Sequence, residues 1–228
     1  ADADVIDAAG GILTPGFVDI HSHGGGTASY DGDAGQIARA MAAHHAHGTT
    51  RTVLSLVTAT QETLRAQLGL IAELAGENPL ILGSHLEGPY LDHGHKGAHA
   101  SELLADPRPE DIDALVDAAR GTLVQITMAP EKPGAMAAIP RLVGAGVRVA
   151  VGHTAAGYAE ALAAFDAGAS ILTHTFNAMA GIHHRAPGPI GAALARDHVT
   201  LELINDGVHV HPAVAEMLWR AADGRVAL

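Results

Sequence analysis

The sequence predicts an α/β fold, an incomplete TIM-type (β/α) barrel with about seven strands. Short runs of apolar and β-branched residues alternate with longer Ala-rich segments of helical period, which indicates a parallel sheet covered by helices. A histidine or an acidic residue follows the apolar core of strand after strand. A barrel gathers the carboxyl ends of its strands at one rim, whereas an open sheet spreads them along a line. A barrel therefore accounts better for the repeated polar strand ends.

The expected elements follow from these two periods and from the residues that end them. Strands are expected over 17–20, 51–57, 80–85, 123–128, 147–152, 170–174 and 199–204. Helices are expected over 34–47, 60–75, 110–119, 134–145, 155–167 and 212–221. Gly48, Gly146 and Gly168 stand where helices should stop, and Pro107 and Pro109 precede another helix. The final residues, "GRVAL", resemble the start of a further strand.

Composition limits what the chain can be. Its 228 residues are 48% hydrophobic and 17% charged, as in one globular domain with a substantial core. Cysteine is absent, so any metal must be held by nitrogen and oxygen atoms. The net charge of −12 argues against a nucleic-acid partner. No apolar run is long enough to span a bilayer and no leader is evident, so we expect a cytoplasmic protein without a membrane partner.

Five residues at strand ends form the main candidate site. In "PGFVDIHSHGGG", His21 and His23 are two residues apart on a strand, so both side chains can face one point. Glu87 and His153 each follow another expected strand, and His174 is the last residue of a further one. Singly, each could be a surface or core residue. The probability that four strand ends carry such residues by coincidence is, however, the product of four separate probabilities and therefore small. Together they predict a divalent metal site, with Zn²⁺ first and Fe, Mn or Co as alternatives.

Other polar residues have weaker claims. The "HHAH" segment, 44–47, ends a helix, where histidines suit the negative end of the dipole. The loop 93–99, "HGHKGAH", is either a surface loop or one that closes over a substrate. Arg185, on a Pro/Gly-rich loop, is either a solvated charge or an anion clamp.

Six motifs, in order, resemble the N-acetylglucosamine-6-phosphate deacetylase family of the amidohydrolase superfamily: "PGFVDIHSHG", "HLEGPYL", "KGAH", "VGHT", "THTFNAM" and "NDGVHV". The resemblance covers essentially the whole chain, and the second, fifth and sixth motifs are its most specific part. It implies a barrel of the metal-dependent amidohydrolase kind beside a small β-sandwich. It also implies hydrolysis of the acetamide of N-acetylglucosamine 6-phosphate to glucosamine 6-phosphate and acetate, a step of amino-sugar metabolism.

The resemblance assigns roles to individual residues. Glu87, His153 and His174 match the principal metal ligands, and His21 and His23 match a second metal position, so one or two ions are expected. The positions that match substrate contacts are Ala98, Asn177, Ala178, Arg185, Asp206, Gly207 and His209.

Three of the implied roles concern substrate chemistry. By the same resemblance, Arg185 and His209 hold the sugar phosphate, with Arg185 reaching into the neighbouring subunit of a homodimer. His99 polarises the amide carbonyl. The departing amine also needs a proton from a general acid.

The resemblance assigns that acid to an aspartate at the end of an eighth strand, for which this sequence has no counterpart. Residues 1–14 resemble the tail of a β-sandwich, and 15–228 a barrel that lacks its last strand. We therefore expect little activity from the chain alone and assign the activity to a longer protein.

Two other functions remain open at this point. A hydrolase of cyclic amides would share the strand-end histidines but often uses a carboxylated lysine, whereas the chain has only Lys96 and Lys132, and Glu87 occupies the expected strand end. A non-catalytic barrel that binds metal would account for the missing aspartate.

Overall fold

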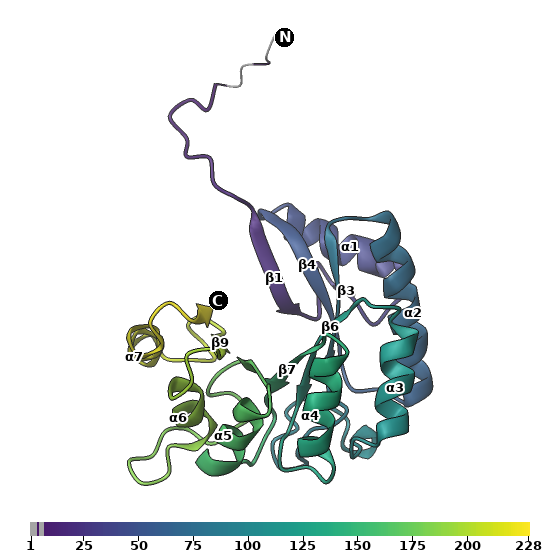
Figure 1. Cartoon of the computed structure of the whole chain (residues 1–228). Coiled ribbons are helices and arrows are strands. Elements are labelled where there is room, and N and C mark those ends of the chain that lie inside the picture. The colour runs from purple at the N-terminus through teal and green to yellow at the C-terminus, as the bar shows by residue number, and fades with distance from the viewer. Residues whose placement is uncertain (1–3, 5–6) are drawn as a thin grey trace.

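A parallel sheet of eight strands forms the centre of the computed structural model, which describes residue 4 and residues 7–228 (Figure 1). Its order is β1-β4-β5-β6-β7-β8-β9-β10, so β1 and β10 are the edge strands. The bounds are β1 Phe17–Ser22, β4 Thr49–Leu56, β5 Ile81–Glu87, β6 Leu123–Met128, β7 Arg148–Val151, β8 Ile171–Leu172, β9 Thr200–Glu202 and β10 Val226–Ala227. The predicted class, an incomplete parallel barrel, is confirmed. The sheet has eight strands where about seven were predicted, because Val226–Ala227 within the terminal "GRVAL" already pairs with β9 as the short strand β10. The last strand is thus short in this chain and not wholly missing, in contrast to the sequence prediction.

Helices connect successive strands, and α1 to α4 lie along the outer side of the curved sheet (Figure 1). Their bounds are α1 Ala34–His45, α2 Gln61–Glu77, α3 Pro109–Ala118, α4 Ala135–Gly144, α5 Tyr158–Asp166, α6 Gly188–Leu194 and α7 Pro212–Ala222. The six expected helices are all present. The short helix α6 was not predicted, because its Pro- and Gly-rich start has the composition of a loop. The hairpin of β2, Gly24–Gly25, and β3, Ala28–Ser29, and the 3₁₀ helix Ser101–Leu103 were also missed.

The helix ends follow the expected chemistry. Asp33 precedes α1 and its side chain accepts a hydrogen bond of 2.8 Å from the backbone N–H of Gln36. The three glycines expected to stop helices have φ values of 95°, 83° and 114° at Gly48, Gly146 and Gly168. Residues with a Cβ rarely adopt this left-handed region, so glycine ends these helices at little cost.

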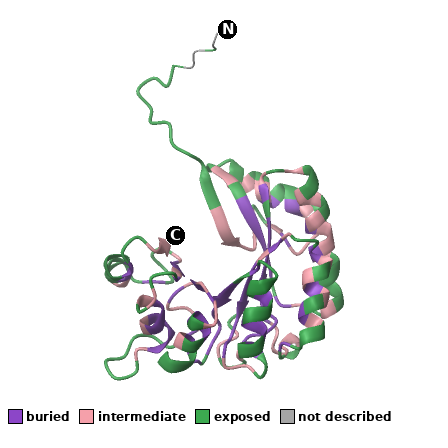
Figure 2. Cartoon of the chain, in the orientation of Figure 1, coloured by how far each residue is buried: buried purple, intermediate pink, exposed green. Residues whose placement is uncertain are grey.

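The apolar core lies between the helices and the outer face of the sheet, as the buried segments in Figure 2 indicate. On α2, Leu64, Leu68 and Ile71 recur at helical spacing and are buried. On the strands, Leu54 and Leu86 are also fully buried. Burying each such side chain contributes roughly 1.5–3 kcal/mol, which holds the helices on the sheet.

The interior of the curved sheet is polar. Thr127 on β6 contacts Thr173 at 2.9 Å and His85 on β5 at 2.9 Å, and His85 also contacts Ser55 on β4 at 3.0 Å. All four side chains are buried. A buried polar layer of this kind must satisfy its own hydrogen bonds, so it fixes the side chains above it.

Two further sequence predictions concern the N-terminal residues and membrane-spanning helices. The tail of a β-sandwich was predicted for residues 1–14, of which 1–3 and 5–6 lie outside the described residues. Residues 7–14 form no helix or strand. Among the helices of the described residues, none has the length and apolar character needed to cross a membrane.

Candidate metal centre

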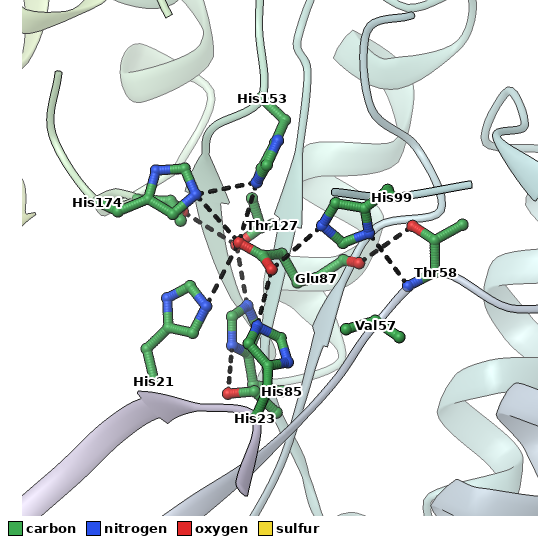
Figure 3. A network of polar contacts seen from close by, with 12 residues as sticks. His21, His23, Val57, Thr58, His85, Glu87, His99, Thr127, His153 and His174 are labelled. Carbon is green, nitrogen blue, oxygen red and sulfur yellow. Dashed lines mark hydrogen bonds and ion pairs between the residues drawn. The ribbon is translucent and has the colours of Figure 1, made fainter. Parts of the chain in front are cut away.

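One buried carboxylate, that of Glu87, is surrounded by imidazoles. Glu87 is the last residue of β5 and is 5% exposed. The Nε2 atoms of five histidines lie 2.8–3.4 Å from its two carboxylate oxygens (Figure 3). These are His21, His23, His99, His153 and His174. The structure thus brings together all five predicted metal ligands and the predicted carbonyl-polarising histidine.

The strand ends explain why these side chains meet. His21 belongs to β1 and His23 follows its last residue, while His153 and His174 lie two residues beyond β7 and β8. His153 and His174 have φ values of 48° and 27°. Residues other than glycine seldom adopt a positive φ, and those that do are often found at functional sites. The turn after each strand therefore aims its imidazole back over the sheet.

Two groups of donor atoms can each hold a metal ion, and they share Glu87. One is His21, His23 and Glu87, the other Glu87, His153 and His174, with the ligand atoms of each group within 4.8 Å of one another.

The tautomer of His153 suits such a role. Its Nδ1 lies 2.8 Å from the backbone carbonyl of His95, and a carbonyl can only accept. Nδ1 therefore carries the hydrogen of the neutral ring and leaves the lone pair of Nε2 facing Glu87.

Ligand spacing provides a second test of fit. In the second group, the Nε2 atoms of His153 and His174 are 2.9 Å apart, and each is 3.1 Å from Glu87 Oε1. Zn–N bonds of about 2.0–2.1 Å place neighbouring ligands of a tetrahedral ion about 3.4 Å apart. Small side-chain rotations would bridge the difference. The donor set fits a divalent ion held by nitrogen and oxygen.

The electrostatics of the cluster call for positive charge. Burial alone would raise the pKa of Glu87, but hydrogen bonds from surrounding histidines outweigh it and hold that pKa well below its usual range. Burial alone would lower the pKa of His21, yet the carboxylates of Glu202 and Glu87 outweigh it and raise that pKa to about 10. Buried carboxylates are costly unless paired, so protons on the imidazoles or a bound cation must compensate them.

His85 lies beneath the cluster and supports it. Complete burial, together with the positive charge of nearby His21, holds the pKa of His85 well below its usual value. Its ring meets that of His21 edge-on, with centroids 4.5 Å apart. Both of its nitrogens are already engaged, by Ser55 and Thr127. His85 is therefore a neutral support for His21 and offers no free donor atom.

A cavity of about 300 Å³ opens above the cluster. It extends from Asp19 and Ile20 on β1 to Ala227 and Leu228 at the other edge of the sheet. The predicted site residues that line it are His21, His23, Glu87, Ala98, His99, His153 and His174. Its volume suits a small molecule.

The remaining predicted substrate residues do not line this cavity. Asn177 is half-buried beside the cluster, where its Nδ2 donates to the carbonyl of His174 at 3.2 Å, and Ala178 accepts from the backbone of Thr154 at 3.1 Å. Arg185 is exposed on the loop before α6. The substrate roles of these residues stay predictions.

The segment Asp206 to His209 is likewise exposed, on the loop after β9. Asp206 contacts His209 Nδ1 at 2.7 Å. Backbone N–H groups of His209 and Val208 lower the pKa of Asp206 to about 2. This segment is thus ordered by its own hydrogen bonds and is not part of the cavity lining.

Two side chains of the site were missed from the sequence. Glu202 ends β9 and is 5% exposed, and its Oε2 lies 2.8 Å from His21 Nδ1. Asp19 lines the cavity and accepts hydrogen bonds from the backbone of His21 and from Ser22 Oγ. A carboxylate inside the apolar run "VTLELI" was the available signal for Glu202.

A family model described as "Amidohydrolase family" matches residues 12–226. The chain belongs to the amidohydrolase family. Amidohydrolases are metal-dependent, which agrees with the two donor groups around Glu87.

Several deacetylases resemble the chain closely. An N-acetylgalactosamine-6-phosphate deacetylase of Escherichia coli O157:H7 is 41% identical over 95% of this chain and 59% of that protein. An N-acetylglucosamine-6-phosphate deacetylase of Vibrio furnissii is 35% identical over 99% of this chain and 58% of that protein. The crystal structure of N-acetyl-D-glucosamine-6-phosphate deacetylase from Mycobacterium smegmatis aligns with a TM-score of 0.92 and 47% identity, over 94% of this chain and 57% of that one. A variant from that organism was solved in complex with N-acetyl-D-glucosamine-6-phosphate.

The resemblance to these deacetylases, inferred from six motifs, is confirmed. The chain spans between 57% and 59% of the length of the three relatives compared.

Proposed function

We propose that the complete protein hydrolyses the acetamide of N-acetylglucosamine 6-phosphate to glucosamine 6-phosphate and acetate. The observation that carries this proposal is the cavity over the Glu87-centred donor set, in a chain whose relatives are deacetylases of phosphorylated amino sugars. Such a reaction belongs to the breakdown or recycling of amino sugars. A phosphorylated substrate does not cross membranes unaided, which supports a cytoplasmic location.

Glu87, His153 and His174 would hold the principal ion, and His21 and His23 with Glu87 a second one. A divalent ion there would lower the pKa of a water molecule and withdraw charge from the amide carbonyl. The absence of cysteine and the imidazole-rich donor set favour Zn²⁺, with Fe, Mn or Co as alternatives.

His99 is placed to stabilise the developing oxyanion. The backbone N–H of Thr58 donates to His99 Nδ1 at 3.3 Å, so the neutral ring carries its hydrogen on Nε2. That nitrogen points at Glu87 Oε2, 3.2 Å away, in the wall of the cavity. In a bound substrate, the same N–H would donate to the carbonyl oxygen as it gains negative charge.

The phosphate would bind on the loops around the cavity. Arg185, which is exposed, would supply the positive charge, and the exposed ring of His209 would add a further contact. Ala98, Asn177, Ala178 and the segment Asp206 to Gly207 would complete the sugar contacts. We infer a homodimer in which Arg185 reaches the neighbouring site, because Arg185 does not line its own cavity.

Acetate release by the metal-loaded complete protein tests the proposal. We expect turnover of N-acetylglucosamine 6-phosphate and none of a cyclic amide such as dihydroorotate. N-acetylgalactosamine 6-phosphate is the second candidate, because the E. coli relative acts on that isomer. Hydrolysis of the cyclic amide alone would favour the other hydrolase class, and metal binding without any turnover would favour a non-catalytic barrel.

A further inference from the structure

Glu202 is the second buried carboxylate of the site, and both of its oxygens are engaged. Oε2 lies 2.8 Å from His21 Nδ1, and Gln125 Nε2 donates to Oε1 at 2.9 Å. A longer contact of 3.4 Å joins Oε2 to the backbone N–H of His174. Glu202 is 5% exposed and Gln125 3% exposed, so water does not compete strongly for these bonds.

These contacts fix one orientation of the His21 ring. An ionised carboxylate only accepts, so Nδ1 of His21 carries a hydrogen and points at Glu202. The opposite nitrogen, Nε2, then faces Glu87 at 3.4 Å. The edge-on contact with His85 supports the same ring from below.

Each metal position has one histidine whose Nδ1 is held, but the partners differ. His153, in the principal position, is oriented by the backbone carbonyl of His95, and His21, in the second position, by the carboxylate of Glu202. The other histidine of each position, His174 and His23, has a buried Nδ1 with no hydrogen-bond partner among the described residues. The second position therefore relies on His21 as its one oriented imidazole, and His21 relies on Glu202.

The contact also spans the open side of the sheet. His21 lies on β1, one edge strand, while Glu202 lies on β9, which is followed only by β10 at the other edge. Neither strand pairs with the other. The side chains of His21 and Glu202 thus connect the two ends of the sheet directly at the metal cluster.

We propose that Glu202, held by Gln125, is a positioning residue that fixes His21 with Nε2 toward Glu87 and thereby sets the affinity of the second metal position. This inference rests on the proposed metal-binding function of the site. Hydrogen-bond partners that orient a ligand histidine typically change metal affinity by roughly 10–100-fold when they are removed.

The test measures Zn²⁺ binding to the metal-free complete protein. Glu202→Met keeps the length of the side chain but removes both acceptors, so we expect the second Zn²⁺ to bind roughly 10–100-fold more weakly, while the first changes by no more than a few-fold. Glu202→Gln keeps an acceptor for His21 and should lose less. Gln125→Met keeps the hydrogen bond between Glu202 and His21 but removes the one that holds Glu202. The loss of affinity for the second Zn²⁺ should therefore be the smallest of the three variants.

A reference variant and a spectroscopic readout separate positioning from general damage. His23→Asn removes a direct ligand and should eliminate the second Zn²⁺ while His21 stays oriented. In proton NMR of the Zn²⁺-loaded protein, a far-downfield Nδ1–H signal should be present in the parent and in Glu202→Gln, and absent in Glu202→Met.

The outcomes divide cleanly. If Glu202→Met binds each of the two ions as tightly as the parent protein does, the inference is overturned. It is also overturned if the parent protein binds only one ion. A parent that binds no ion would instead contradict the proposed function. If Glu202→Met does not fold, unchanged second-site affinity in both Glu202→Gln and Gln125→Met would overturn the inference.

Discussion

The side chains of the buried cluster around Glu87 and those of the exposed loops that follow β8 and β9 are held in place by different contacts. His153 is clamped between a backbone carbonyl at 2.8 Å and Glu87 at 3.1 Å. Arg185 and His209, in contrast, lie exposed on loops whose hydrogen bonds are largely their own. The strand ends and the His95 carbonyl preorganise the cluster, whereas the two loops would be placed against a substrate only when it binds or when a neighbouring subunit is present. Changes in the two regions should therefore affect different steps.

The largest effect should come from the centre of the cluster. Glu87→Gln keeps the shape but removes the charge that both donor groups share, so both metal positions should be lost. We expect acetate release to fall by at least about 1,000-fold, since the chemistry depends on the ion. Metal analysis and an acetate assay check this, with the exposed Glu62→Gln on α2 as a control that should retain both. If Glu87→Gln retains metal and turnover, Glu87 is not the ligand that the two metal positions share.

His99 separates catalysis from metal binding within the same cluster. His99→Ala removes the proposed Nε2–H donor but none of the five predicted ligands. We expect kcat to fall roughly 100–1,000-fold, as for loss of one oxyanion donor, while metal content and KM stay near those of the parent. Steady-state kinetics with metal analysis decide the matter. A variant that loses metal would instead make His99 a ligand.

Arg185 provides a test of the exposed loops, because it is the loop residue proposed to bind the substrate phosphate. Arg185→Ala should raise KM for the phosphorylated substrate by roughly 10–100-fold, the size of one charged hydrogen bond, and leave kcat nearly unchanged. Unphosphorylated N-acetylglucosamine is the control substrate, and its KM should not change. An equal effect on both substrates would contradict the phosphate role.

Mixed dimers test whether Arg185 acts across subunits. If it does, a dimer of one Arg185→Ala chain and one Glu87→Gln chain contains one site with both groups intact. Each mixed dimer should then have about half of the activity of the parent dimer at low substrate. If Arg185 serves its own site, mixing gives no gain.

The same division between cluster and loops governed what the sequence could predict. Strand-end residues such as His153 were predictable because parallel strands deliver their carboxyl ends to one side. Helix α6 was missed because local composition, Pro187 and Gly188, outweighs a helix of only seven residues. The run "VTLELI" marks Glu202 as a carboxylate in an apolar strand, but its role depends on a contact with His21, 181 residues away, which no local pattern records. Long-range pairing is thus the part of the site that only the structure supplies.

The smallest predicted effect lies where a loop meets the cluster. Gly97 has a φ of 58°, and a Cβ there would come within 3.2 Å of Cε1 of His153. Gly121 has a φ of 86° and open space around it, so Gly121→Ala measures the backbone cost alone, about 1 kcal/mol. Gly97→Ala should lose a similar amount of stability and, in addition, bind the principal ion a few-fold more weakly, because the methyl group displaces the His153 ring. Thermal unfolding and Zn²⁺ titration of both variants separate the two effects. Equal Zn²⁺ affinity in the two variants would mean that the cluster tolerates movement of His153, and that its order is less strict than the clamped geometry implies.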